Sequence, residues 1–214
     1  IIKSGSPAIF GPQSDVALQV LKDKAHRHDV TPYAFGEGWS CQLLDRETWQ
    51  YEGGPFSGIY PLPVLNGPHQ IPNAGTALAV LESLPQFNLT HDHIVQGLSA
   101  VEWPARMQRL VRGNLVRRAP SSTQIWLDGG HNAAAGEQIA KCFQSWQEDE
   151  DIPTYLVSGM LNTKDQLSYY RHLQPIIDKA IMVPIMGEDA STPASTPRKR
   201  LRPSTKRSSS SRAR

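Results

Sequence analysis

The sequence has few cysteines and lacks the common signatures of metal and nucleophilic sites. Its two cysteines, Cys41 and Cys142, are far apart and match no metal or redox spacing. It contains no HExxH, CxxC, GxSxG or GxxxxGK[ST] segment. The histidines of the pairs 26/28 and 91/93 are separated by one residue, so we expect them to point in different directions. We therefore expect no zinc site, no serine-hydrolase elbow and no P-loop in this chain.

The sequence also lacks a long hydrophobic run. Hydrophobic residues make up 39% of the 214 residues, and the longest apolar runs are far too short to span a membrane. The first residues show no basic region followed by an apolar one, so they predict no signal peptide. The chain starts at Ile1 without an initiator Met, and we expect a fragment of a longer protein. Cytoplasmic localisation and unpaired thiols are the simplest expectation.

Acidic residues are absent from the C-terminal end. From Ala190 onward the chain carries eight Lys and Arg, so of the 22 basic and 20 acidic residues, 14 and 20 remain in the preceding part. That part is acidic, and only the tail is basic. The tail has almost no apolar side chains to offset its ordering entropy, and we expect disorder over 191–214. A basic tail also raises the alternative of a nucleic-acid-binding or regulatory protein that acts through the tail. The acidic body argues against nucleic-acid binding.

The residues that remain predict alternating strands and helices. The segment 14–28 has near-helical apolar spacing with Ser14 or Asp15 as N-cap, and 73–84 and 90–101 predict two further helices. Four short aromatic-rich pieces between residues 31 and 62 predict a small β-meander. After about residue 106 the order is strand, helix, strand, helix, strand. This alternation predicts a parallel sheet of an α/β domain.

The segment "IWLDGGHNAAAG", residues 125–136, contains the first group of candidate site residues. In a doubly wound sheet, ligands bind beyond the carboxyl ends of strands, where helix N-termini offer free N–H groups. Glycines there allow close approach to a phosphate, Asp128 can accept from ribose hydroxyls, and His131 can reach a phosphate oxygen. The alternative is that Asp128 and Asn132 only cap the turn.

Three other segments contain isolated candidates. Arg106, after Trp103 and Pro104, can clamp a phosphate with two hydrogen bonds or can be an ordinary solvated charge. Asn73, which follows His69 and Gln70 in "GPHQIPNAG", can bind an adenine edge or cap a helix.

Lys164 and Asp165, in "GMLNTKD", follow a predicted strand. The lysine can meet an anion, or the pair can simply start a helix.

Taken in order, "IIKSGSPAIFGPQ", "GPHQIPNAGTALAVLESL", "VEWPARMQRL", "WLDGGHNAAAG" and "GMLNTKD" closely resemble one family. That family is the bifunctional dihydrofolate synthase/folylpolyglutamate synthases, a branch of the Mur ligases, with its GxHQxxNA, WP(G/A)R and DG(A/G)HN segments. The likeness extends to about Ser191. It stops at the Ser/Pro/Arg-rich tail, an abrupt change that resembles a frameshift. Ala133 stands where the family usually has Pro.

The resemblance implies an ATP-dependent amide ligase of folate biosynthesis. ATP phosphorylates the carboxylate of dihydropteroate or of a folate's terminal glutamate, and L-glutamate then attacks the acyl phosphate. By resemblance, Asn73 binds the adenine and Arg106 the phosphates. Asp128 contacts the ribose or the linker arginine, and His131 lies near the phosphates. Lys164 and Asp165 are weaker candidates for glutamate binding.

The resemblance also implies a division of the chain into enzyme domains. Residues 1–105 are the C-terminal part of the central ATPase domain, 106–190 a smaller Rossmann-like domain with a mostly parallel sheet, and 191–214 a disordered basic tail. The Mg²⁺ ligands, the phosphate loop and most of the pterin site are expected upstream, and no metal ligand in this chain. We expect an inactive fragment of a monomeric enzyme that does not bind a membrane.

Overall fold

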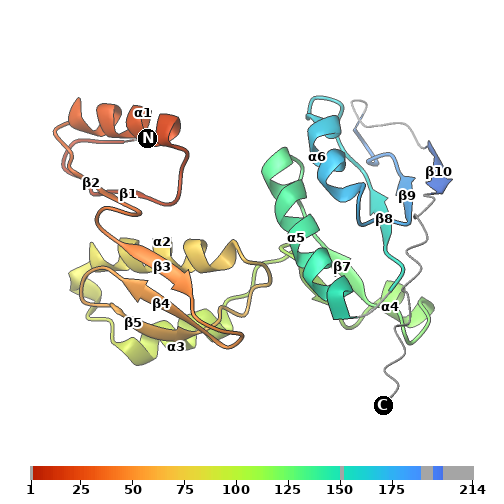
Figure 1. The fold of residues 1–214 in the computed structure, drawn as a ribbon, viewed down its shortest axis with the longest axis horizontal. Coiled ribbons are helices and arrows are strands. Elements are labelled where there is room, and N and C mark those ends of the chain that lie inside the picture. Colours follow the sequence, from red (N-terminus) through yellow and green to blue (C-terminus); the bar gives the residue numbers. More distant parts are fainter. Residues whose placement is uncertain (1, 150–151, 189–194, 200–214) are drawn as a thin grey trace, which may run out of the picture. The chain divides into compact units, whose positions relative to one another are not determined.

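The computed structural model describes residues 2–149, 152–188 and 195–199. The chain folds as two compact units, one ending at Gly129 and one beginning at Gly130 (Figure 1). We call them the first and the second unit. This division falls later than the predicted domain boundary after Ala105, because the loop around Arg106 is bonded to the end of the strand before Gly129. The assignment of 1–105, 106–190 and 191–214 to enzyme domains stays a prediction.

The first unit begins with a small parallel sheet and one helix. Strand β1 (Ala8–Phe10) pairs in parallel with β2 (Pro32–Ala34), and α1 (Asp15–His26) connects them. Ser14 is the N-cap of α1, as one of the two predicted alternatives, and accepts a hydrogen bond from the Ala17 amide at 3.4 Å. Ala25 of the helix is fully buried against the two strands.

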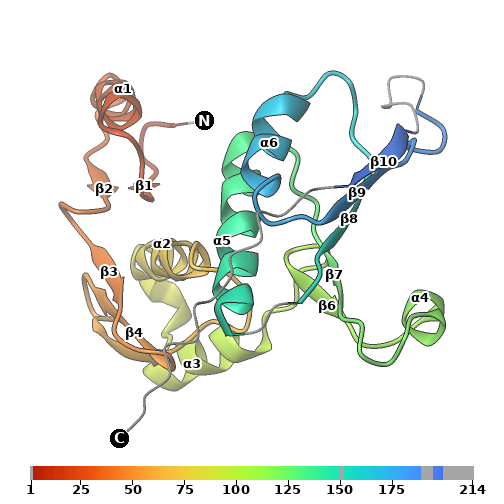
Figure 2. The ribbon, with the colours of Figure 1, turned by 45° about the vertical axis from the view of Figure 1, so that its right-hand side comes forward.

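The predicted meander is confirmed for three of its four pieces. β3 (Ser40–Leu43), β4 (Thr48–Glu52) and β5 (Gly58–Pro61) form an antiparallel sheet in that order, whereas the piece at 32–34 pairs with β1 instead. Helices α2 (Gln70–Glu82) and α3 (His91–Ala100) lie on one face of this sheet (Figures 1 and 2). Thr90 caps α3, and His93 completes a capping box. A short 3₁₀ helix, η1 (Pro85–Phe87), joins α2 to α3.

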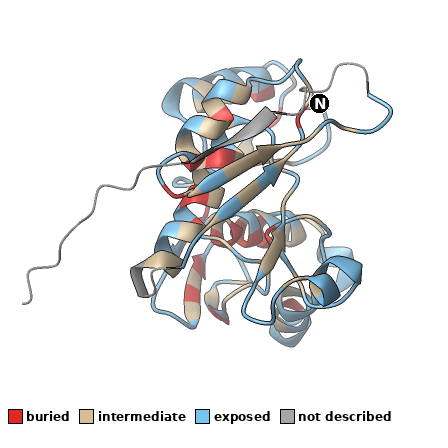
Figure 3. Cartoon of the chain, turned by 90° about the vertical axis from the view of Figure 1, so that its right-hand side faces the viewer, coloured by how far each residue is buried: buried red, intermediate tan, exposed pale blue. Residues whose placement is uncertain are grey.

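The core of the first unit is aromatic. Trp49, Tyr51 and Tyr60 of the sheet are fully buried against Leu78 of α2 and its neighbours. Figure 3 marks buried residues in red on both helices and strands.

The carboxylate of Glu82, at the end of α2, is a hub for this core. It accepts hydrogen bonds from the hydroxyls of Tyr33 and Tyr51, at 3.2 and 2.9 Å, and from the amides of Gly54 and Phe56, at 2.9 and 3.2 Å. Burial and this carboxylate raise the pKa of Tyr51. Four donors from three segments therefore tie the sheet, its β4–β5 turn and α2 together.

One strand is not where the alternation places it. β7 (Ile125–Leu127) pairs antiparallel with β6 (Gln108–Leu110), in the first unit, and the short helix α4 (Asn114–Arg118) lies in their connection. The prediction that the 125–127 strand joins the parallel sheet is thus wrong. The nearer strand in sequence, β6, pairs with it across a short connection, which costs less loop entropy.

The second unit has the predicted strand–helix alternation. β8 (Tyr155–Ser158) pairs in parallel with β9 (Lys179–Met182), and α5 (Ala133–Asp149) packs against α6 (Gln166–Leu173). The core includes Ala140, Tyr169 and Leu173. The α/β class is therefore confirmed.

The tail forms one element that the sequence does not predict. β10 (Ser195–Lys199) pairs antiparallel with the open edge of β9, so the prediction of disorder is wrong for these residues. An unpaired strand edge supplies backbone hydrogen-bonding groups whatever the side chains, which is why composition misses such a strand. The rest of the predicted disordered tail lies largely outside the described residues. Among the described residues, no helix is long and apolar enough to cross a membrane.

Candidate functional site

Three sequence candidates, Asn73, Arg106 and Asp128, all lie in the first unit. Asn73 is in the first turns of α2, Arg106 is in the loop before β6, and Asp128 directly follows β7. Asn73 and Arg106 are exposed, and Asp128 is half-buried. His69, the residue before α2, links the last two electrostatically, because its pKa responds to the charges of both Asp128 and Arg106.

The loop that carries Arg106 has an unusual backbone. The two neighbours of Arg106 adopt a left-handed backbone conformation although neither is glycine, with φ of 56° at Ala105 and 42° at Met107. This conformation is costly for residues with a side chain and persists only where surrounding contacts enforce it.

Those contacts come from the end of β7 and from Asn66, which lies in the loop before α2. The Met107 amide donates to Asp128 Oδ2 at 2.8 Å, and the Gly129 amide donates to the Ala105 carbonyl at 2.9 Å. Asn66 Nδ2 donates to the Met107 carbonyl at 3.3 Å, and Met107 itself is buried. The backbone on both sides of Arg106 is therefore fixed, while its guanidinium stays exposed and makes no ion pair with any described residue.

The turn-capping alternative therefore describes Asp128 only in part. Asp128 orders a loop from a distant segment rather than only its own turn. Asn132 does act locally, as its Oδ1 accepts from the Ala135 amide at 2.9 Å at the start of α5.

At the start of α2, two side-chain hydrogen bonds connect Asn73 to His69 through Gln70. Asn73 Nδ2 donates to Gln70 Oε1 at 3.1 Å, and Gln70 Nε2 lies 3.0 Å from His69 Nε2. Gln70 is buried. The helix-cap alternative for Asn73 is wrong, because the N-cap position is His69, and Asn73 is inside the helix.

His69 is the last residue of this hydrogen-bonded series, and its Nδ1 has no hydrogen-bond partner among the described residues. If Gln70 donates to Nε2, the imidazole proton is on Nδ1, which is buried and has no hydrogen-bond partner among the described residues. Burial, more than the opposing effects of Asp128 and Arg106, lowers the pKa of His69. The lowered pKa favours the neutral ring, and in this tautomer Nδ1 is a donor beside the Arg106 and Asp128 charges. His69 was absent from the sequence candidates. Its position in the GxHQxxNA pattern was the available signal.

Of the candidates in the second unit, Asp165 has well-defined local contacts. His131 is exposed just before α5, and Lys164 is exposed in the loop before α6. Asp165 is the N-cap of α6 and accepts from the Ser168 amide at 3.1 Å and from its hydroxyl. The Ser168 hydrogen bonds lower the pKa of Asp165. For Asp165 the helix-start alternative is therefore confirmed.

No metal cluster is formed within the described parts of the chain, where no three His, Cys, Asp or Glu side chains come together. Cys41 and Cys142 form no disulfide, and burial raises the pKa of the Cys41 thiol to about 11.

Comparisons with known proteins give the same family as the motifs. Human mitochondrial folylpolyglutamate synthase is 27% identical over 226 residues, which cover 90% of this chain and 35% of the relative. The dihydrofolate synthase/folylpolyglutamate synthase of Haemophilus influenzae is 28% identical over 87% of this chain and 43% of its own length. A bifunctional enzyme of that name, solved with Mn, AMPPNP and L-glutamate bound, superposes with a TM-score of 0.69 at 25% identity, over 90% of this chain and 42% of its own. No protein-family model matches the chain.

The fold is thus the α/β fold of Mur-type ligases. Within that class, the chain is a homologue of the folylpolyglutamate and dihydrofolate synthases. It spans less than half the length of the relatives that it matches.

Proposed function

We propose that this chain is part of an ATP-dependent amide ligase that adds L-glutamate to dihydropteroate or to a folate. The carboxylate of the acceptor is phosphorylated by ATP, and the glutamate amine displaces phosphate from the acyl phosphate. The observation that carries the proposal is the first-unit cluster, in which three motif segments distant in sequence contribute Asn73, His69, Arg106 and Asp128.

Each side chain suits a part of a nucleotide. The Asn73 amide suits an adenine edge, and the exposed Arg106 guanidinium suits phosphate oxygens. The Asp128 carboxylate, which accepts from the Met107 amide, is of a kind that suits a ribose hydroxyl or a cation. The buried Nδ1–H of His69 suits an acceptor atom of the ligand. Since phosphoryl transfer depends on positioned charge, the fixed loop of Arg106 is the feature most directly linked to turnover.

In the second unit, we propose His131 for the phosphates and Lys164 and Asp165 for glutamate, on the family resemblance alone. The contacts of Asp165 are those of a helix cap, which makes Lys164 the better candidate of the pair. Mg²⁺ is expected to accompany ATP, and we assign no ligand for it among the described residues. Nucleic-acid binding through the tail is not favoured.

We further propose that the enzyme acts as a monomer in the cytoplasm. Two of the relatives are named as mitochondrial, so cell fractionation with an antibody to this chain is the direct test of the compartment.

The decisive test is ADP release by the protein completed to the length of its relatives. With ATP, L-glutamate and either dihydropteroate or a folate monoglutamate, we expect release that requires both the amine and the pterin. ADP release independent of glutamate, or none with either pterin, would contradict the proposed function. The 214-residue chain alone is expected to show no glutamate-dependent release.

A further inference from the structure

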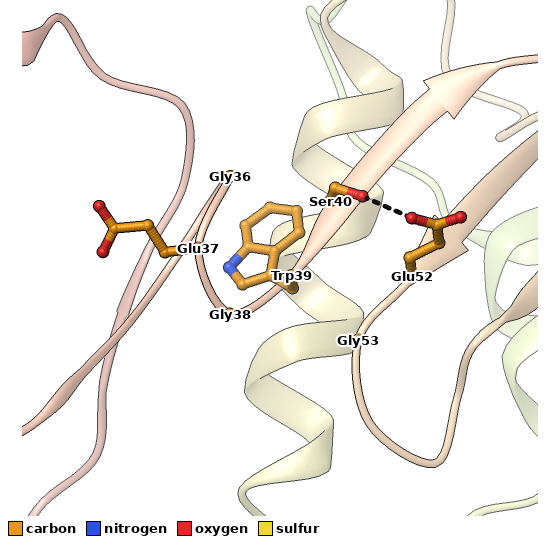
Figure 4. A pocket seen from close by; sticks show the side chains of 7 residues that line it. All are labelled: Gly36, Glu37, Gly38, Trp39, Ser40, Glu52 and Gly53. Atoms are coloured by element: carbon orange, nitrogen blue, oxygen red, sulfur yellow. Dashed lines mark hydrogen bonds between the residues drawn. The ribbon is translucent and has the colours of Figure 1, made fainter.

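Two buried side-chain nitrogens of the first unit have no hydrogen-bond partner among the described residues. They are Nε1 of Trp39 and Nδ1 of His69. Trp39 lines a pocket around the turn Gly36–Ser40, which contains none of the candidate residues of the ligase (Figure 4). His69 instead contacts Gln70 through its other ring nitrogen, and Gln70 contacts Asn73. Only the second of these nitrogens therefore belongs to a side chain that is linked by hydrogen bonds to a candidate residue.

Gln70, the first residue of α2, makes this link. It is buried, with 6% of its surface exposed, although its side chain ends in an amide. An amide that is buried without partners costs free energy, and both ends of this one are bonded. Its Nε2 lies 3.0 Å from His69 Nε2, and its Oε1 accepts from Asn73 Nδ2 at 3.1 Å. Two contacts of opposite polarity hold the amide in one orientation.

The polarity of these contacts sets the orientation of Asn73. The Nε2 group of Gln70 can only donate, so His69 Nε2 is the acceptor and its ring is neutral. Burial favours the neutral ring, since it lowers the pKa of His69. Gln70 therefore turns its oxygen toward Asn73. The Nδ2 group of Asn73 points to this buried amide, and its Oδ1 points away from it.

The outer end of the Asn73 amide is open to a ligand. Asn73 is exposed, and no described residue donates to its Oδ1. Its Nδ2 group keeps a second hydrogen beside that acceptor. Adenine offers the complementary pair, an amino group next to a ring nitrogen, and asparagine binds this edge of adenine with two hydrogen bonds in nucleic-acid complexes. Hypoxanthine and guanine carry an oxo group instead of that amino group, so a second acceptor would face Oδ1.

We propose that Gln70 determines the base specificity of the nucleotide site by fixing the Asn73 amide. Held by Gln70, Asn73 Oδ1 accepts from the 6-amino group of adenine and repels the 6-oxo group of other purines. Gln70 does not touch the nucleotide, so it is a positioning residue. This role rests on the proposed function, in which a nucleotide binds at Asn73.

The test compares binding of ADP and IDP, the inosine nucleotide, which differ at position 6 of the purine. Their Kd values are measured by calorimetry on the protein completed to the length of its relatives, without pterin or glutamate. We expect the unsubstituted protein to prefer ADP about tenfold or more. Gln70→Met, which has a similar volume but forms no such hydrogen bonds, should reduce this preference to about twofold. Gln70→Glu should preserve it, because a carboxylate still accepts from Asn73 Nδ2.

A control variant and the pattern of losses separate base selection from a general loss of structure. Gln42→Met, at an exposed glutamine of β3, should leave the preference unchanged. If Gln70→Met weakens both nucleotides by the same factor, or if Gln70→Glu loses as much preference as Gln70→Met, the proposal is overturned. The proposed ligase function fails separately, when a protein that prefers ADP to IDP shows no glutamate-dependent ADP release.

The orientation itself is testable in the 214-residue chain without a nucleotide. Long-range ¹H–¹⁵N correlation at a pH of about 8, where the ring is neutral, shows which nitrogen of His69 carries the proton. His69→Gln identifies its resonances among those of the seven histidines. We expect the proton on Nδ1, with Nε2 accepting from Gln70. A proton on Nε2 would reverse both amides, present Asn73 Nδ2 to the ligand in place of Oδ1, and overturn the proposal.

Discussion

The two units hold their candidate residues in different ways. In the first, the loop around Arg106 is joined to Asn66 and to Asp128 by hydrogen bonds between distant parts of the sequence, whereas the side-chain hydrogen bonds of Asn73 are local. In the second, the hydrogen bonds that Asp165 accepts from Ser168 reach only three residues along its own helix. The comparison teaches that long-range hydrogen bonds support a functional role for a motif residue better than local ones do. Any helix cap makes local contacts.

The largest expected effect is the loss of turnover when the exposed charge of Arg106 is removed. In the protein completed to full length, Arg106→Ala should reduce glutamate-dependent ADP release by about two to three decades, since it removes a fixed charge from the transferred phosphoryl group. Arg171→Ala, an exposed arginine of α6 in the second unit, is the control and should stay within about twofold. Comparable losses in both variants would remove the distinction between the units.

The next effect concerns the hydrogen-bonded core of the first unit. Glu82→Ala leaves two tyrosine hydroxyls and two amides without their acceptor. We expect it to lower the free energy of unfolding by about 3 kcal/mol, measured by urea denaturation. Glu47→Ala serves as the exposed comparison and should change it by less than about 0.5 kcal/mol. A loss below 1 kcal/mol in Glu82→Ala would show that the hub is not a main support.

The second unit depends instead on close helix packing. A Cβ at Gly136 of α5 would lie 2.5 Å from the Tyr169 carbonyl oxygen of α6, a backbone atom that cannot move alone. Gly136→Ala should therefore destabilise the protein by about 2 kcal/mol. Gly97→Ala in α3 meets nothing within 4 Å and should stabilise it by about 0.5 kcal/mol. Thermal unfolding of both variants checks the contrast, and equal signs would contradict it.

The smallest effect is a pH dependence that sharpens the role of His69. Because burial lowers its pKa from 6.5, the unfolded chain binds a proton more readily than the folded one. The stability contributed by the neutral ring is present above pH 6.5 and is lost as the pH falls through and below that value. Urea denaturation between pH 8 and pH 5 should show a shallower decline in His69→Gln than in the unsubstituted chain. Parallel curves would mean that the ring titrates equally in both states.

Much of the local structure was predictable from the residues themselves. The caps Ser14 and Thr90, the antiparallel strands at 40–61 and the parallel pair at 155–182 follow from capping chemistry and from apolar periodicity. The motifs around Asn73, Arg106 and Asp128 were also visible. These signals are local, because they depend on residues within a few positions of one another.

Only the tertiary structure decided how the motifs are joined. Three features depend on contacts across tens of residues. They are the pairing of β7 with β6, the left-handed backbone around Arg106, and the position of His69 near the charges of Arg106 and Asp128. A strained backbone leaves no mark in composition, since the contacts that enforce it come from elsewhere in the chain. The sequence thus determined the family, the α/β class and the candidate residues. The tertiary structure decided that Asp128 orders the Arg106 loop while Asp165 caps a helix, because the same carboxylate chemistry serves either role and only the position of the donor distinguishes them.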